Sequence, residues 1–536
     1  MIFFYYPLIL ISILGYGFFA SKKLLKLNNF NLGYQGIVGI FLLLLISYLS
    51  TQFIPHNKLF NLFILVFGVG LFIKFFKGLN IDKKNIKILT IIVIISFIFI
   101  LVGKNHDDFH YYHFPYTLIL TEYSHPIGLG NLNHGFKTHS SIFLFSSLFN
   151  LPFASLNLFH LAPAYIMVFS NYVLIKLILN KDNRKNFIFI TFISLAALTF
   201  INIFFYRLGE HGTDRSAMIL IILLTINLIF FINKNTKVID TNYLKIFTII
   251  FSIIISLKAM YIIYVILFFP LVFYVYKKKK SINLFFNNSL FYSLLLFGFV
   301  LLTNFFNTGC LIFPEKKTCF FEMPWSLTSD TVEYLRTHYE IWAKAGSGTG
   351  YEITESEKAK YLLNFNWVNN WTEKYFFNKM SDFLLSLTFV LIVFYILFKS
   401  SKLSKKYKRN FKLVYLILIF ITLIWFMLHP ALRYGGYHLF FLIFFVPFSL
   451  FLEKYSDRIK NLDQKILIVI MIVALTFIGR NILRLNKEYK IYSYNPLKNP
   501  NYPISEFSFR YQKKINNQIK DNKIKKIYRN RYVILN

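Results

Sequence analysis

The 536 residues are 56% hydrophobic and only 15% charged, and the apolar residues come in blocks of about 18 or more without a charge. Blocks of this length span a bilayer core, so the composition excludes a soluble globular protein and predicts an all-α polytopic membrane protein. The formal net charge of +35 could indicate a nucleic-acid partner, but the lysines flank hydrophobic blocks and no nucleic-acid-binding signature accompanies them. We therefore attribute the charge to membrane orientation.

Hydropathy predicts 12 to 14 transmembrane helices along the chain. The first block has lysines only after it, which is typical of a retained helix and not of a cleaved signal peptide. The predicted segments are 2–20, 36–54, 59–79, 86–103, 158–179, 186–206, 215–233, 243–257, 259–276, 286–306, 382–399, 411–428, 435–452 and 465–483.

Lysine-rich connections fall on alternate loops, and short-loop charge assigns those loops to the cytoplasm. The outer face then holds residues 104–137, the turn "RLGEHGTDR", residues 307–381, "HPALRYGGYH" and the basic tail, although the charge of the tail argues the other way. We divide the chain into a transmembrane domain at 1–485, with outer loops 104–157 and 307–381 forming a small periplasmic layer, and a tail at 486–536. Within the first loop, 138–157 is broken at Pro152 and predicts an interfacial or re-entrant helix.

The stretch "NHDDFHYYHFPY", residues 105–116, follows a hydrophobic run directly and contains two adjacent carboxylates. A half-exposed carboxylate just past a helix end suits a general base, and we favour Asp108 over Asp107. The alternative is an aspartate that caps the short helix after it. The nearby histidines could instead bind a divalent cation with the aspartates, but no HExxH-type motif accompanies them, and we expect no metal or other cofactor.

Charged side chains recur at other predicted outer helix ends. Glu210 and Asp214 share one short turn with two arginines, with which they could simply pair. Lys258, between two hydrophobic runs, and Arg433, at the mouth of a helix, are placed to meet an anion at the membrane surface, or else to snorkel.

The predicted outer segment 307–381 contains four of the five tryptophans, which could stack on sugar rings or anchor the membrane interface. Cys310 and Cys319 lie in the same segment. Outside the cytosol this pair could form a disulfide if the two Cα atoms come within range, and the spacing leaves this open.

"DFHYYHFP" at 108–115, followed by "GLGNLNHGFKTHSS" at 128–141, resembles a set of bacterial membrane proteins with a D-x-x-x-Y-H-x-P stretch and a G-L-G-N-L stretch in one outer loop. More broadly, an acidic pair in a large outer loop near the amino end resembles the GT-C superfamily of integral membrane glycosyltransferases. Asp214, Lys258 and Arg433 fall where such proteins tend to have an acid, a lysine and an arginine. The chain departs from the better-known members, which have a single helix before the acidic loop.

The resemblance implies an inverting hexosyl- or pentosyltransferase in the bacterial cytoplasmic (inner) membrane, with its active site facing the periplasm. The implied partners are membrane lipids, a polyprenyl-phosphate sugar donor, and a glycolipid, polysaccharide or protein acceptor, with no nucleic acid. The implied site has Asp108 and Asp107 as catalytic residues, with substrate-binding residues His113, Lys137, Glu210, Asp214, Lys258, Arg433 and Tyr434.

Two other functions stay open at this point. A polysaccharide polymerase or ligase would depend on later loop residues such as Arg336 and His338. A lipid or solute transporter would place ionisable groups at mid-bilayer on broken helices related by a repeat, and neither feature is evident in the sequence.

Overall fold

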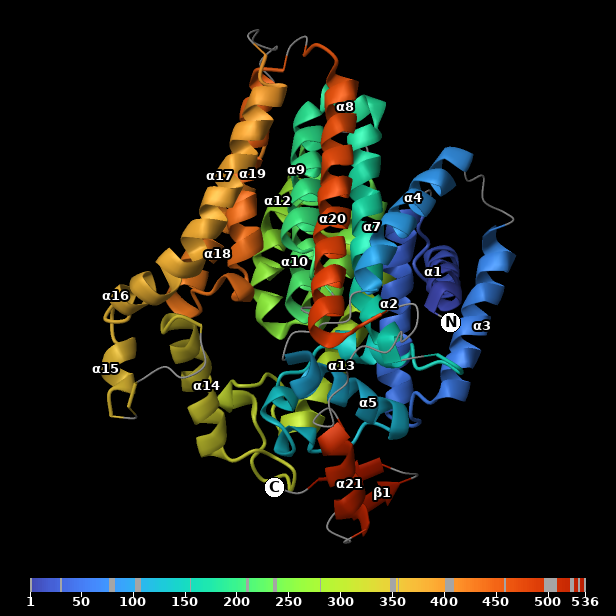
Figure 1. Cartoon of the computed structure of the whole chain (residues 1–536), viewed down its shortest axis with the longest axis vertical. Helices are drawn as coiled ribbons and strands as arrows, with labels where there is room; N and C mark the ends of the chain where they lie inside the picture. Colours follow the sequence, from blue (N-terminus) through green and yellow to red (C-terminus); the bar gives the residue numbers. More distant parts are fainter. Residues whose placement is uncertain are drawn as a thin grey trace.

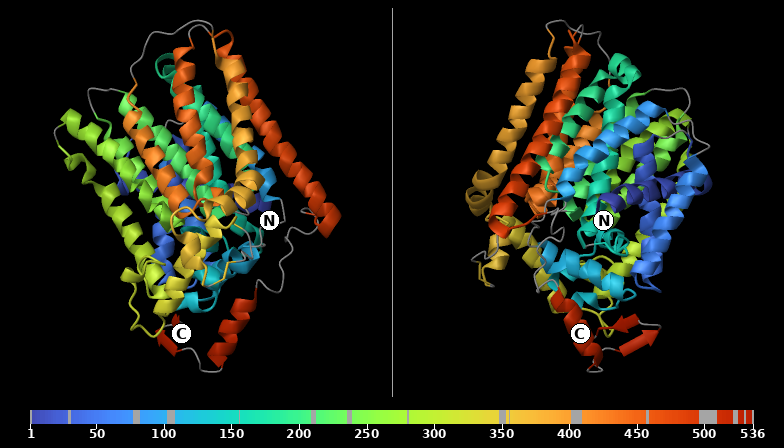
Figure 2. Two further views of the ribbon diagram at one scale, coloured as in Figure 1. Left: turned by 90° about the vertical axis from the view of Figure 1, so that its left-hand side faces the viewer. Right: turned by 45° about the vertical axis from the view of Figure 1, so that its right-hand side comes forward.

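The protein is an all-α polytopic membrane protein (Figure 1). A computed structural model describes residues 2–28, 31–76, 82–101, 108–154, 156–208, 212–234, 239–279, 281–347, 353–354, 356–400, 409–456, 459–495, 509–520, 525–528 and 531–534. Long helices form one bundle, and shorter elements form a layer across one end of it, which we call the layered end (Figures 1 and 2).

Each of the fourteen predicted segments contains a helix among its described residues. In the part of the chain described, ten helices are long and apolar enough to cross a membrane. They are α1 Ile2–Phe19 with its continuation to Leu24, α2 Leu32–Thr51, α3 Lys58–Phe76, α7 Leu161–Leu179, α10 Gly212–Asn233, α12 Phe268–Lys279 with η7 Ala259–Leu267, α13 Asn288–Thr308, α17 Ser381–Phe398, α19 Gly436–Lys454 and α20 Leu462–Tyr492.

Four further helices complete the bundle. Three have 17 residues each and are apolar, and the fourth begins with three lysines in its first five residues. These helices are α9 Ile188–Phe204, α11 Thr241–Leu257, α18 Lys412–Leu428 and α4 Lys83–Ile100.

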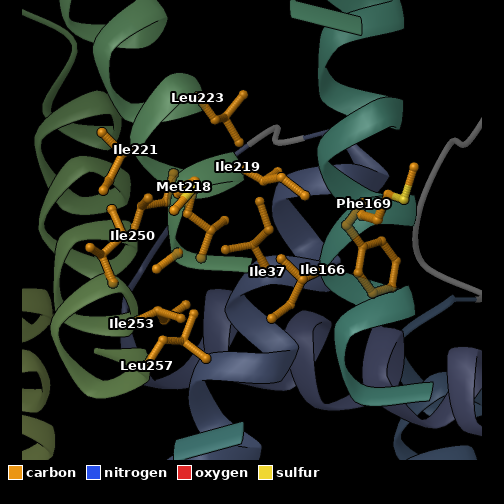
Figure 3. Packing of buried hydrophobic residues seen from close by; sticks show 14 of the residues in the cluster. Ile37, Ile166, Phe169, Met218, Ile219, Ile221, Leu223, Ile250, Ile253 and Leu257 are labelled. Carbon is orange, nitrogen blue, oxygen red and sulfur yellow. The ribbon is translucent and has the colours of Figure 1, made fainter. Parts of the chain in front are cut away.

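The centre of the bundle is formed by α2, α7, α10 and α11. Their apolar side chains interlock, with Ile37, Ile166, Met218 and Ile250 meeting between the four helices (Figure 3). Because α10 is apolar on all sides, it can be buried along its whole length, as a helix of that composition must be in a polytopic protein. Peripheral helices such as α3, α17 and α20 instead keep many large apolar side chains exposed, where they meet lipid.

The layered end is built from short elements that follow the long helices. These are η2 Phe109–His113, α5 Phe114–Glu122, α6 Ser141–Ser147, α14 Ser329–Lys344, α15 Lys358–Leu362, α16 Val368–Trp371, α21 Arg510–Lys520, β1 Lys525–Tyr528 and β2 Arg531–Val533. The short helix α8 Lys181–Asn186 lies at the opposite end, in a lysine-rich connection (Figure 1).

The tail lies at the layered end, on the same side of the bundle as the Asp108 segment. The Ile127 amide donates to the Tyr532 carbonyl, and the Ile534 amide donates to the Ile127 carbonyl, both at 2.9 Å. Gly128 turns the chain here with φ +83°, a conformation that favours glycine. The described tail residues therefore lie on the side of the bundle that the number of predicted helices assigns to them, and not on the side that the basic charge of the tail favours.

Three details differ from the predictions or complete them. Among the described residues of segment 138–157, the one α-helix is the seven-residue α6, and every residue of α6 is buried. An interfacial helix would keep one face exposed, so the interfacial alternative is wrong, while the re-entrant alternative stays a prediction. Cys310 and Cys319 form a disulfide. The helix α20 continues past the predicted domain boundary at residue 485, as far as Tyr492.

Candidate functional site

Four charged side chains from four separate elements form one chain of ion pairs near the layered end. Asp214 lies in the first turn of α10, Lys258 ends α11, Arg433 lies in η11 Leu432–Tyr434, and Asp108 directly precedes η2. Arg433 Nη2 lies 2.6 Å from Asp108 Oδ2, and Arg433 Nε lies 3.0 Å from Asp214 Oδ2. Lys258 Nζ lies 3.0 Å from Asp214 Oδ1.

Local backbone geometry explains how two of these side chains reach the site. Lys258 has an extended backbone, with φ −155° and ψ 110°, and separates α11 from η7. It is the single non-apolar residue between two apolar runs. Gly435 follows the Arg433 turn with φ +119°, a backbone conformation that L side chains rarely adopt. Trp371 Nε1 donates to the Pro430 carbonyl at 2.7 Å and holds the start of this turn.

The members of the ion-pair chain differ in burial, and Asp214 is the most buried. The side chain of Asp214 is 5% exposed, that of Lys258 19%, that of Asp108 24% and that of Arg433 30%. Although burial works to lower the pKa of Arg433, Asp214, Tyr112 and Asp108 together raise it well above its ordinary value. Arg433 therefore stays charged, with a closed, fully paired side at Asp214 and a more open side at Asp108.

The two simpler roles considered for the carboxylates do not hold. Asp108 stands at the cap position of η2, but its side chain makes no capping hydrogen bond and pairs with Arg433 instead. Asp214 pairs with residues far along the chain, not with the arginines of its own turn. Arg215 lies over the rings of Phe205 and Tyr437, at 5.5 and 6.0 Å from their centroids.

A family described as "Domain of unknown function (DUF8201)" matches residues 1–440, most of the chain. The protein belongs to this family. The DUF8201 match includes all four members of the ion-pair chain and ends within α19. No curated protein and no solved structure matches the chain.

Two other predicted site residues of this DUF8201 protein lie beside the ion pairs. His113 is buried, and burial lowers its pKa to about 3, although Asp108 works to raise it. It is therefore neutral at physiological pH. Burial likewise raises the pKa of Tyr434 to about 12, with Arg433 opposing, and the Trp342 ring packs against it at 5.5 Å. Trp342 thus contacts the residue that follows Arg433, while Trp371 supports the backbone of the turn.

One residue near the site was missed in the sequence. Tyr112 is buried, and its pKa is raised by burial and lowered by Arg433, so its hydroxyl lies within the field of the ion pairs. A Cβ on Gly135 would lie 2.4 Å from Tyr112 Cγ, so a glycine is needed for the ring to pack here. Tyr112 lies in the motif at 108–115 and Gly135 in the motif at 128–141. The occurrence of both motifs in one loop was the sequence feature that could have indicated this contact.

Lys137 lies apart from the ion-pair chain. Among the described residues it pairs with neither Asp108 nor Asp214, and it instead contributes to lowering the pKa of His134, after burial, to about 4. Tyr339 and His134 share a hydrogen bond at 3.2 Å, and the His134 and His338 rings lie 5.9 Å apart. This forms a second polar cluster of the layered end.

Asp107, Glu210 and His106 lie outside the residues that the structure describes. Within the described ranges, no three His, Cys, Asp or Glu side chains are grouped as metal ligands would be. The described site offers cations for an anion and carboxylates for a proton.

Proposed function

We propose that this protein is an inverting glycosyltransferase that moves a sugar from a polyprenyl-phosphate carrier to an envelope acceptor. The observation that supports this most is the Asp108–Arg433 pair. It joins a partly exposed carboxylate to a partly exposed cation at the end of an apolar bundle. The two substrates of such a transfer offer a matching group for each side chain. The phosphate of a lipid-linked sugar suits a guanidinium, and the hydroxyl proton of the acceptor suits a carboxylate.

In this proposal the donor phosphate competes with Asp108 for Arg433. Its arrival frees the carboxylate, which then takes the proton of the acceptor hydroxyl. The acceptor oxygen bonds to the anomeric carbon as the bond to the phosphate oxygen breaks, and the phosphate leaves with that electron pair. Arg433 and Lys258 stabilise the leaving group, and Asp214 holds both cations in place.

Neighbouring groups support substrate binding. His113 Nε2 is buried and has no hydrogen-bond partner among the described residues, so it is available to a sugar or acceptor hydroxyl. Tyr434 and Trp342 place aromatic surface beside Arg433, which suits a sugar ring.

We assign the layered end to the periplasmic side of a bacterial cytoplasmic membrane. The Cys310–Cys319 disulfide belongs to this end, and disulfides persist in oxidising compartments. Lysine-rich connections such as α8 lie at the opposite end, as the positive-inside rule requires.

Reporter fusions test this sidedness. Alkaline phosphatase fused after Asn536 is expected to be active, because the tail packs on the layered end, and the same reporter after Ser400 is expected to be inactive. A fluorescent protein that folds only in the cytoplasm serves as the matched control, with the opposite result at each position. Cytoplasmic reporting from the tail would overturn the assignment.

Arg433→Ala is expected to lower donor use about a hundredfold, because a leaving phosphate loses its main charged donor. Asp214 keeps Lys258 as a partner in this variant, so the fold should survive. The measurement is initial rate against donor concentration in membrane vesicles, with a polyprenyl-phosphate sugar as substrate. An unchanged donor dependence would remove Arg433 from the site.

The transferase proposal as a whole is tested by the lipid-linked glycans of cells with and without the protein. A polyprenyl-phosphate sugar should accumulate, and one sugar should disappear from an envelope glycan, when the protein is absent. Identical profiles of both the carrier lipids and the envelope glycans would contradict it.

A further inference from the structure

A second group of cations surrounds a cavity of about 340 Å³ at the end of α20 nearest the layer. Its cationic lining residues are Arg207, Arg480, Arg484 and Lys487. Arg207 comes from the connection after α9, and the other three lie on successive turns of α20. The cavity shares no residue with the ion-pair chain of Asp108, and it is bounded partly by α20, beyond the 1–440 match.

Fixed contacts shape this cavity. The Arg480 guanidinium lies 3.7 Å from the centroid of the Tyr206 ring and donates to the Ile203 carbonyl at 2.5 Å. Arg484 lies 3.6 Å from Glu488, the one carboxylate among the described residues that line the cavity. Within the described lining, four cations and one carboxylate give a formal charge of +3 (4 − 1 = 3).

The cavity lies where the bilayer surface should be. The helix α20 runs along the outside of the bundle (Figures 1 and 2). Arg480 is 18 residues beyond Leu462, or about 27 Å at the α-helical rise, which is close to the hydrocarbon thickness of about 30 Å. Two lining side chains, Leu483 and Ile491, are 69% and 56% exposed, so apolar surface adjoins the cations.

Membrane orientation does not explain these cations. The positive-inside rule accounts for basic residues at the end of the bundle opposite the layer, but these four lie at the layered end, where they weaken the charge bias. Four like charges around a small cavity also repel one another. An anion bound among them would offset the weakened charge bias and relieve the repulsion between the cations. Guanidinium groups match the oxygen geometry of a phosphate.

We propose that this cavity binds a phosphate group, that of a membrane lipid headgroup whose acyl chains lie along the exposed face of α20. Leu483 and Ile491 would contact the chains, while the arginines and Lys487 hold the phosphate oxygens. This site does not depend on the proposed glycosyl transfer, because it uses none of the residues assigned to that reaction.

A pair of charge reversals on one helix tests the site. Lys487 lines the cavity, whereas Lys490, also exposed and on the same end of α20, does not. The full-length protein is exchanged into nanodiscs of phosphatidylcholine containing phosphatidic acid, and lipids retained on the released protein are counted by native mass spectrometry. Lys487→Glu should reduce retention of phosphatidic acid at least about tenfold, and Lys490→Glu should leave it near the wild-type level.

Two further arms identify the source of the phosphate and guard against misfolding. Arg207→Gln alters the other wall of the cavity and should also lower retention, while gel filtration confirms that each variant is folded. Inorganic pyrophosphate that binds wild-type protein as tightly in neutral nanodiscs would assign the site to a soluble phosphate and not to a lipid. Equal retention of phosphatidic acid by wild type, Lys487→Glu and Arg207→Gln would overturn the phosphate site itself.

Discussion

Asp108→Asn is expected to lower sugar transfer about a thousandfold, within the range for removal of a general base. An amide cannot take the proton of an acceptor hydroxyl, although it has nearly the shape of the carboxylate. Arg433 keeps its contact with Asp214, so the variant should insert and accumulate like the wild type. The measurement is the transfer rate in membrane vesicles with a polyprenyl-phosphate sugar, normalised to protein by immunoblot.

The matched control is Asp382→Asn. Asp382 is an exposed aspartate in the first turn of α17 and belongs to no ion pair of the site. It should retain full activity. Substantial transfer by Asp108→Asn would exclude the carboxylate as the base, whatever the outcome for Asp382.

Asp214→Ala is expected to cause the largest loss of stability, about 3–5 kcal/mol, because it leaves Lys258 and Arg433 without their shared buried partner. The side chain is 5% exposed, so little water can replace the carboxylate. The loss should appear as a much lower midpoint when detergent-solubilised protein is heated and the remaining monodisperse fraction is measured by gel filtration.

Glu453→Ala separates stability from chemistry. Glu453 is also buried and pairs with Arg409 at 2.7 Å, on α19 at the end of the bundle opposite the layer. Its removal should lower the heating midpoint in a similar way, yet the folded fraction should still transfer sugar. A midpoint for Asp214→Ala equal to that of the wild type would mean that the ion pairs contribute little to the fold.

The sequence was sufficient for the helices because a span of lipid requires an uninterrupted apolar block, which is a local property. It also located the break at Lys258, one polar residue between two apolar runs. The burial of α6 could not be predicted from its sequence, because helix surfaces that pack against protein and those that meet lipid have the same apolar composition.

The individual site residues were visible as charges at predicted helix ends, but their pairing was not. Asp108 meets Arg433 across 325 positions, and Asp214 meets it across 219. Such contacts depend on how four helix ends converge, which no local pattern specifies. Local reasoning instead offered capping for Asp108 and pairing within the turn for Asp214, the nearest partners along the chain.

The span between these partners has a consequence for biogenesis. The ribosome delivers Asp108 to the translocon together with the first helices, whereas Arg433 emerges only after most of the bundle has been inserted. The tail residues that bond to Ile127 are made later still. A nascent chain therefore carries this carboxylate through most of its synthesis before Arg433 exists, and the Asp108–Arg433 pair forms only after Arg433 has been translated.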